Sequence, residues 1–208
     1  MSEADTKTSE EEVDPGAYPT LSAETLQALV RQETPALEEF FEAYFDRLYG
    51  YVRRLVQHEQ LAEDLTQDIF LHLQQAFPKY DPERELRPWV FTIATNKIRD
   101  FWRSRRHRDT QVEKSVELGE DFRLDLPSEA DGPAAELARG EVAESVRRAV
   151  DELPEGLRVT VVLRIFEGLS FEAIGEIVER NEVAVRKRYS RALETLRQSL
   201  HSDPREEL

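Results

Sequence analysis

The sequence contains no cysteine among its 208 residues, which excludes disulfide bonds and thiolate metal sites. The four histidines (His58, His72, His107 and His201) are isolated, so no pair has the spacing of metal ligands. There is no Gly-rich phosphate loop, and no histidine can be paired with a carboxylate for catalysis. The sequence therefore predicts a protein that is not an enzyme, with no catalytic residues, no metal and no cofactor.

Long apolar runs are also missing. No stretch approaches the roughly 18 residues that a membrane-spanning helix needs. Residues 1–13 are acidic and lack the basic-then-apolar pattern of a signal peptide. We therefore expect a cytoplasmic protein with no membrane insertion.

Positive charge is outnumbered by negative charge but is concentrated in two places. The formal net charge is −15, yet residues 84–108 hold eight Arg and Lys against two acids, and residues 186–197 hold five against one. Clustered like charges repel one another, and a polyanion partner such as nucleic acid is the commonest reason to tolerate this. Two solvated helix faces are the alternative explanation.

Apolar residues recur at three- and four-residue spacing, which predicts amphipathic helices and no strands. Three such stripes, at 40–55, at 61–77 and after Pro88, predict a small helical bundle. Further stripes after Val142 predict shorter helices and a final one that ends near Leu200. The expected fold is all-α, with two small helical domains joined by an acidic linker.

Composition divides the chain into five segments. An acidic N-terminal extension (1–22) is expected to be disordered, and a charged linker to be mostly extended. The segments are the extension (1–22), a first helical domain (23–108), the acidic linker (109–141), a second helical domain (142–201) and a tail (202–208).

The second helical domain contains a short helix after Ser170, a break at residues 179–181 and a basic helix that Asn181 can cap. This order is typical of a helix-turn-helix motif, whose second helix enters the DNA major groove. Its outward residues would meet base edges and phosphates. These candidates are Asn181, Glu182, Ala184, Arg186, Lys187, Arg188, Ser190 and Arg191. A purely structural hairpin with a basic face is the alternative.

The first basic segment combines positive charge with aromatic residues. A Pro-rich loop at 77–88 precedes its helix, and we expect Tyr80 and Arg84 at the loop surface, with Trp89 and Phe101 in the core. This combination suits single-stranded or distorted DNA better than plain duplex. The candidate contacts are Tyr80, Arg84, Arg87, Asn96, Lys97, Arg99, Arg103, Arg105 and Arg106. For the last two, a helix C-terminus favoured by the helix dipole is the alternative.

Three segments of the first helical domain resemble region 2 of bacterial sigma factors. They are Ala-Glu-Asp-Leu-Thr-Gln-Asp-Ile-Phe at 62–70, Trp-Val-Phe-Thr-Ile-Ala-Thr-Asn at 89–96 and Asp-Phe-Trp-Arg at 100–103. The stretch from Leu153 to Ala192 resembles region 4. Regions 2 and 4 joined directly by a linker are typical of the extracytoplasmic-function (ECF) type. The ordered pair is far more specific than either motif alone.

The resemblance implies docking on core RNA polymerase. In the family, the helix with the Glu-Asp-Leu-x-Gln-Asp-x-Phe pattern contacts the coiled coil of the β′ subunit, and the β flap is a second expected contact. The corresponding residues here are Glu63, Asp64, Gln67, Asp68, and Phe70 or Leu71. Without the resemblance, a solvated helix face would explain these acids.

The resemblance also assigns both basic segments to promoter DNA. The loop at about 75–87 corresponds to the element that captures a flipped minus-10 base, and the helix after it, with Asn96, Lys97, Asp100 and Arg103, lines the melted strand. The C-terminal basic helix would read minus-35 duplex. About 30 linker residues reach roughly 100 Å at 3.3 Å each, which exceeds the roughly 60 Å between two elements some 17 base pairs apart. The acidic linker either mimics RNA in the polymerase channel or only solubilises the chain.

The helix-turn-helix departs from the family pattern at three positions. The family usually has Gly at the turn and then an apolar residue, where this chain has Glu179 and Arg180. Ala184 replaces a usual Thr, which removes a hydroxyl that would contact phosphate. We therefore expect a turn of different shape and a minus-35 sequence unlike that of relatives.

The expected function is that of an alternative sigma factor, which binds core polymerase, recognises the minus-35 and minus-10 elements and promotes strand opening. An anti-sigma factor is a further expected partner. Two alternatives stay open, namely a self-sufficient dimeric helix-turn-helix regulator and a sigma-mimicking adaptor that sequesters an anti-sigma factor. We also expect weak promoter binding by the isolated chain, because its acidic segments compete for its basic helices.

Overall fold

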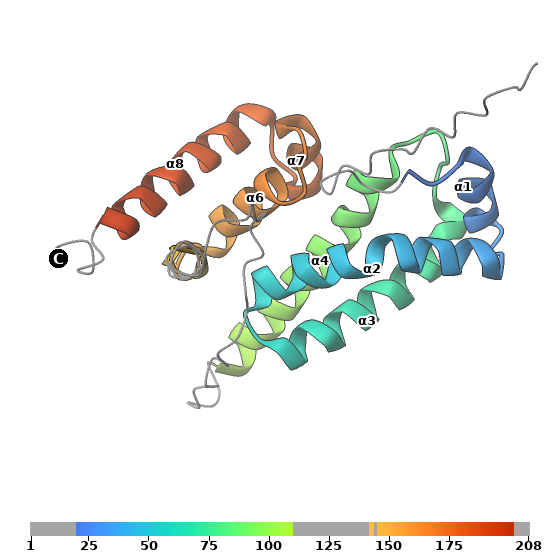
Figure 1. The fold of residues 1–208 in the computed structure, drawn as a ribbon, viewed down its shortest axis with the longest axis horizontal. Coiled ribbons are helices and arrows are strands. Elements are labelled where there is room, and N and C mark those ends of the chain that lie inside the picture. The colour runs from blue at the N-terminus through green and yellow to red at the C-terminus, as the bar shows by residue number, and fades with distance from the viewer. Residues whose placement is uncertain (1–19, 110–141, 144, 202–208) are drawn as a thin grey trace, which may run out of the picture.

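A computed structural model describes residues 20–109, 142–143 and 145–201, with side chains omitted at 106–109. Helices joined by turns make up this part of the chain, which confirms the all-α prediction (Figure 1). None of these helices is long and apolar enough to cross a membrane. The predictions for the N-terminal extension, the linker and the tail fall almost entirely outside the described residues.

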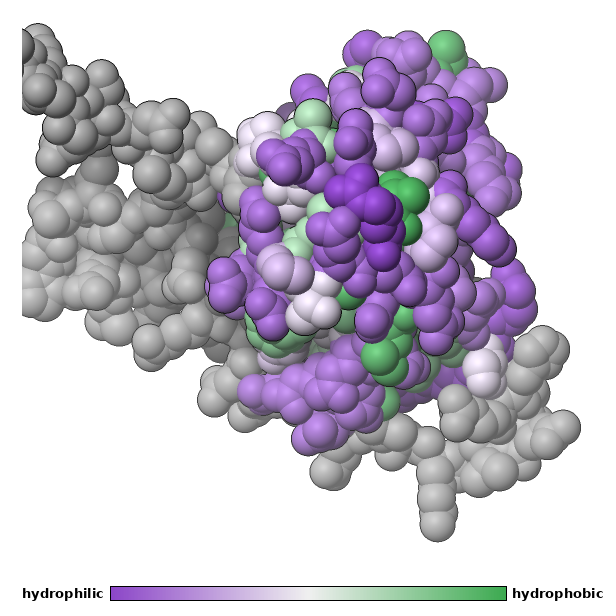
Figure 2. All heavy atoms as spheres, turned by 90° about the vertical axis from the view of Figure 1, so that its right-hand side faces the viewer, coloured by the Kyte–Doolittle hydropathy of each residue, from purple (hydrophilic) through white to green (hydrophobic). Residues whose placement is uncertain are grey.

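The first helical domain is built on three long helices that lie side by side (Figure 1). These are α2 (Thr34–Val56), α3 (Glu59–Ala76) and α4 (Leu86–Asp109), with the short α1 (Ala23–Val30) and the 3₁₀ turn η1 (Phe77–Lys79) at one end. Their apolar stripes meet in a core whose largest fully buried side chains include Phe40, Leu48, Tyr51, Ile69, Phe77 and Phe91. Figure 2 looks onto the end that carries α1, where hydrophilic side chains dominate and apolar ones form separate small spots.

One buried polar contact joins α2 to α4. The Tyr51 hydroxyl and the Thr95 hydroxyl lie 2.7 Å apart, both fully buried, and Thr95 also donates to the Phe91 carbonyl. Because no water reaches this site, burial raises the pKa of Tyr51 above its ordinary value. A buried hydroxyl that has found a partner avoids a desolvation penalty of about 1–3 kcal/mol, so this pair also fixes how the two helices are aligned.

The second helical domain contains helical residues 142–143 and 145–151, followed by α6 (Glu155–Ile165), α7 (Phe171–Val178) and α8 (Glu182–His201). Both predicted N-caps are confirmed. The Ser170 hydroxyl accepts from the Ala173 N–H at 3.1 Å, and the Asn181 side-chain oxygen accepts from the Ala184 N–H at 2.8 Å.

The two helical domains share one hydrophobic core, which the sequence did not predict. α7 packs against α4, and α6 packs against α2. Val159, Val162, Ile174 and Ile177 belong to the same buried cluster as the core of the first domain. A smaller separate cluster holds α8 to α6 through Val161, Ala192 and Leu196 among others. α8 extends away from the α2–α4 bundle (Figure 1).

This packing explains where side-chain burial differs from the periodicity. Phe91 is fully buried although it lies off the predicted stripe of α4, because α4 is covered by the first domain and by α7. Trp89 and Phe101 pack against the core but are only half-buried. Ile165 and Leu193, both placed on predicted stripes, are exposed, because neither stripe is covered along its whole width.

Candidate nucleic-acid interface

The outward face of α8 carries the residues expected to meet minus-35 DNA. Val185, Ala192 and Leu196 are buried against the rest of the domain. On the other side, six candidates are exposed and two, Ala184 and Arg188, are half-buried. The exposed ones are Asn181, Glu182, Arg186, Lys187, Ser190 and Arg191.

Arg186 is held in place by its neighbours. Its guanidinium donates from Nε to the Glu182 carboxylate at 2.9 Å and lies 4.5 Å from the centre of the Phe171 ring. Arg164 lies 4.7 Å from the centre of the same ring. Cation–π contacts of this kind contribute about 0.5–1 kcal/mol at exposed sites. Arg186 therefore has a structural role, and its side chain is already ordered where a phosphate would meet it.

The turn before α8 accommodates its unusual sequence by adopting a strained backbone conformation. Glu179 has φ 55° and ψ 49°, the left-handed conformation that glycine favours at a helix C-terminus. The next residue, Arg180, donates its backbone N–H to the Gly175 carbonyl at 2.9 Å. The turn passes so close to α7 that a Cβ at position 175 would lie 2.6 Å from the Arg180 carbonyl oxygen. Glycine is thus required at 175, while 179 tolerates a glutamate under strain.

The loop before α4 differs from the prediction at Tyr80. Tyr80 was expected at the surface, and this prediction is wrong, because its side chain is only 4% exposed. The ring packs against Trp89, with centroids 4.8 Å apart, and the hydroxyl donates to the Arg84 carbonyl. Burial raises the pKa of Tyr80. Arg84 is exposed, as predicted, so Tyr80 shapes the loop that presents Arg84.

The candidate minus-10 residues of α4 do not all point the same way. Asn96, Asp100 and Arg103 are exposed, and Asp100 pairs with Arg103 at 3.3 Å. Arg87, Lys97, Arg99 and Arg105 are half-buried, and the side chain of Arg106 lies outside the described residues. Of these, Arg99 reaches the second helical domain.

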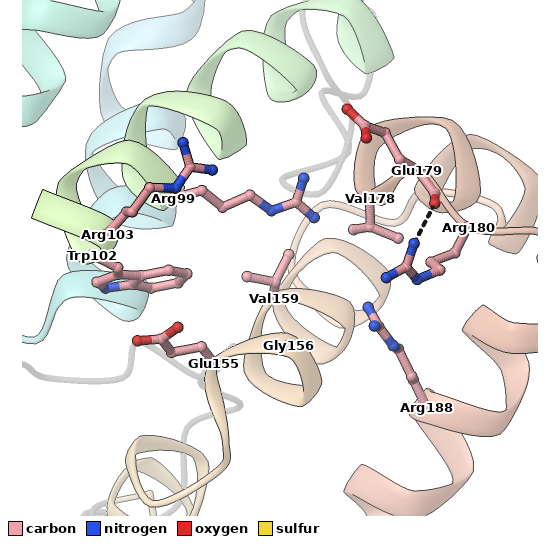
Figure 3. A pocket seen from close by; sticks show the side chains of 10 residues that line it. All are labelled: Arg99, Trp102, Arg103, Glu155, Gly156, Val159, Val178, Glu179, Arg180 and Arg188. Carbon is pink, nitrogen blue, oxygen red and sulfur yellow. Dashed lines mark hydrogen bonds between the residues drawn. The ribbon is translucent and has the colours of Figure 1, made fainter. Parts of the chain in front are cut away.

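Arg99 links α4 to the end of α7. It donates to the Asn96 side-chain oxygen and to the Ile177 carbonyl, both at 3.5 Å. The two basic segments consequently meet at one cleft, lined by Arg99 and Arg103 from α4 and by Arg180 and Arg188 from the helix-turn-helix (Figure 3). No signal in the linear sequence indicated this meeting, because it depends on how the domains pack.

The α3 face, defined here as Glu63, Asp64, Gln67, Asp68 and Leu71, is exposed along its length. Leu71 is 58% exposed although it is a large apolar residue. These are five of the residues expected to dock on polymerase. A single exposed leucine is ordinary on a protein surface, so the family resemblance, and not the exposure of Leu71, assigns this face to a protein partner.

Aromatic side chains extend the α3 face onto α2. Phe70 is half-buried, and its ring lies 4.9 Å from Phe41 and 6.0 Å from Phe45, centroid to centroid. Phe41 is 46% exposed. The apolar periodicity at 40–55 predicted Phe41 in the core stripe of α2. Its exposure beside Phe70 makes it a functional candidate that the periodicity concealed.

Two sigma-70 family models match the chain. The sigma-70 region 2 family model matches residues 40–108, and the sigma-70 region 4 model matches residues 143–196. RNA polymerase sigma factor CarQ of Myxococcus xanthus is 33% identical over 169 residues, which cover 79% of this chain and 89% of that protein. ECF RNA polymerase sigma factor SigE of Mycolicibacterium smegmatis is 30% identical over 188 residues, covering 90% and 70%.

Two solved structures share the fold. CnrH, in complex with the cytosolic domain of CnrY, has a TM-score of 0.62 at 24% identity, covering 87% of this chain and 97% of that one. RpoE from Bartonella quintana, in complex with the anti-sigma factor NepR, has a TM-score of 0.60 at 21% identity, covering 80% and 97%. The matched regions and the relatives together show that this chain belongs to the sigma-70 family and is an ECF-type RNA polymerase sigma factor.

Proposed function

We propose that this sigma factor docks on core RNA polymerase through the α3 face, together with the exposed Phe41 beside it. The single observation that carries the proposal is that face itself, where three carboxylates, an amide and a largely exposed leucine lie in the segment that matches the family's polymerase-binding helix. Acidic side chains beside exposed apolar ones suit a basic partner surface, because charge speeds encounter and apolar burial holds the complex.

Promoter contacts divide between the two helical domains. The loop that carries Arg84, followed by Asn96, Asp100 and Arg103 on α4, is assigned to the opened minus-10 strand. The outward face of α8 is assigned to the minus-35 duplex. The minus-10 site would trap an unpaired base, whose unstacking costs a few kcal/mol that pocket contacts must offset. Core polymerase performs the chemistry, so the chain itself acts without catalysis, and we place it in the cytoplasm.

The shared core supports a closed resting arrangement of the isolated chain. The two promoter elements lie roughly 60 Å apart at 3.4 Å per base pair. Helices α4 and α7 pack directly against each other, and Arg99 contacts the α7 backbone. The domains therefore separate when both elements are engaged. This closure gives a second reason, besides the acidic segments, to expect weak promoter binding without polymerase.

An anti-sigma factor is the regulatory partner that we infer. The RpoE relative of the same fold was solved with an anti-sigma factor. On this chain, the exposed acidic α3 face and the exposed Phe41 beside it form the surface that such a protein would have to cover to block polymerase.

Polymerase docking is tested by measuring the affinity of the full chain for core enzyme. We expect Asp64→Lys to weaken binding about tenfold or more, since it reverses the charge of one of the three carboxylates on the α3 face. Glu24→Lys is the matched control, because it makes the same change at an exposed position on α1. Equal affinity for both variants and the original chain would overturn the docking assignment.

A further inference from the structure

A basic cleft lies between the two helical domains. Its volume is about 340 Å³, and Figure 3 shows the side chains that line it. Arg99 enters from α4, Arg180 from the turn after α7, and Arg188 from α8. The guanidinium groups of these three arginines point toward one another across the cleft (Figure 3). The basic cleft therefore gathers positive charge from both domains.

The charge of this cluster is incompletely compensated. Arg188 makes no hydrogen bond or ion pair with any other residue in the described part of the chain. Burial lowers the pKa of Arg188, and repulsion from Arg180 and Arg99 lowers it further. Arg180 donates from its side chain to the neighbouring Glu179 carbonyl at 3.1 Å. A guanidinium has five N–H donors, so most of the donors in the cluster remain available.

The two acids at the rim do not neutralise the cluster. The Glu179 carboxylate turns away from Arg188, and the Glu155 carboxylate lies beside the Trp102 ring, on the far side from Arg180 and Arg188 (Figure 3). Three like charges that converge in a partly enclosed space repel one another, and the repulsion opposes the packing of the two domains. A small anion in the cleft would turn this repulsion into attraction.

We propose that the basic cleft binds a small, multiply charged phosphate anion of the pyrophosphate or nucleoside diphosphate class, which bridges the two helical domains. Guanidinium groups match phosphate oxygens in pairs, so three of them suit two linked phosphates. Trp102 lines the same cleft and offers an aromatic ring to a base. The cleft is bounded by both domains, which favours a small ligand over a nucleic acid chain.

Occupancy has a consequence beyond the proposed function. Arg99 and Arg188 are also candidate DNA contacts, one for each promoter element. An anion held between these two arginines prevents both from contacting DNA. It also adds contacts that exist only while the domains are packed together. Binding therefore favours the closed arrangement at the expense of the open one.

The test measures pyrophosphate binding to the full chain by calorimetry at fixed ionic strength, with sulfate as the reference anion. We expect pyrophosphate to bind at least tenfold more tightly than sulfate, and Arg180→Gln and Arg188→Gln each to weaken it about tenfold or more. Arg197→Gln is the matched control, because it removes the same charge from an exposed position on α8 outside the cleft. We expect that variant to bind within about twofold of the original chain. Circular dichroism confirms that each variant is folded.

Equal binding of pyrophosphate and sulfate, or equal loss in all three variants, would overturn the proposal, because either result indicates only diffuse attraction to positive charge. Binding of a single-stranded oligonucleotide with no binding of pyrophosphate would overturn it too. ADP that binds more tightly than pyrophosphate, and loses that advantage in Trp102→Leu, supports the nucleotide as the ligand. Equal affinity of ADP and pyrophosphate supports the free phosphate anion.

Discussion

The guanidinium of Arg158 donates a hydrogen bond of 3.1 Å to the carbonyl oxygen of Leu55, and so ties the second helical domain to the end of α2. The same group donates to the Leu153 carbonyl at 2.9 Å and to the Asp151 carbonyl. From the other side, the Gln57 amide donates to the Asp151 carbonyl at 2.8 Å. The last carbonyls of a helix lack partners within it, and Arg158 supplies one across the domain boundary.

Replacement of Arg158 by methionine is expected to loosen the closed arrangement. Methionine keeps much of the bulk but removes the donor to the Leu55 and Leu153 carbonyls, which costs roughly 2–4 kcal/mol. The Asp151 carbonyl keeps its hydrogen bond from Gln57. Distances between spin labels on α3 and α8 should become longer and more broadly distributed. Arg148→Met is the control, because Arg148 is exposed in the same domain. An unchanged distance distribution in Arg158→Met would show that the hydrogen bonds of Arg158 do not hold the domains together.

Glu179→Gly is expected to stabilise the helix-turn-helix. A side chain in the left-handed conformation costs about 1–2 kcal/mol, part of which glycine returns in unfolded-chain entropy, so the net gain in unfolding free energy should be about 1 kcal/mol or less. Glu176→Gly, three residues earlier within α7, should instead lose about 1 kcal/mol. Denaturant unfolding measures both. A loss at both positions would mean that residue 179 is not strained.

Gly175→Ala is expected to destabilise the same domain by about 1–3 kcal/mol, because its Cβ would press on the Arg180 carbonyl. The contrasting variant is Gly156→Ala in α6. A Cβ there would meet only the Arg188 side chain, at an ordinary 3.8 Å, so that variant should gain about 0.5–1 kcal/mol. Thermal unfolding of the two variants should therefore shift in opposite directions, and shifts of the same sign would refute this reading of the turn.

Asp151 predicts a pH dependence of stability. Burial raises the pKa of this carboxyl above its ordinary 3.8, although Arg147 lies 3.4 Å away. A raised pKa means that the folded protein binds the proton more tightly, so stability is gained as pH falls through the raised pKa and lost as pH rises through it. At pH 7, Asp151→Asn should therefore be at least as stable as the original chain. The stability of the variant relative to the original chain should decline as the pH approaches 4. A relative stability that is clearly lower at pH 7 than at pH 4 would contradict the predicted sign.

The sequence predictions that were confirmed depend on patterns within one continuous segment of the chain. The apolar stripe of α8 and its Asn181 cap are properties of one continuous segment, so the buried and exposed sides of that helix, apart from Leu193, followed from spacing alone. The assignment of the α3 face to polymerase binding depended instead on family resemblance, because a run of acids on a helix is equally consistent with a solvated surface that has no partner.

What the sequence could not predict depends on tertiary packing. Tyr80 lies in a loop whose composition suggested exposure, yet the chain folds it over Trp89 and buries it. Phe91 lies off the stripe predicted to face the three-helix bundle, and the packing of α7 on α4 was not anticipated. The shared core and the basic cleft arise from contacts between segments about 80 residues apart, such as that of Arg99 with Ile177, and periodicity within a helix carries no information about them.

Run-off transcription with purified core RNA polymerase and genomic DNA fragments distinguishes a sigma factor from both alternatives. We expect specific transcripts only when this chain is added, and weak binding of the isolated chain to the same promoters at physiological salt. Tight promoter-specific binding without polymerase would contradict this expectation in favour of a self-sufficient regulator. Binding to core enzyme with no transcript from any fragment would contradict it in favour of a sigma-mimicking adaptor.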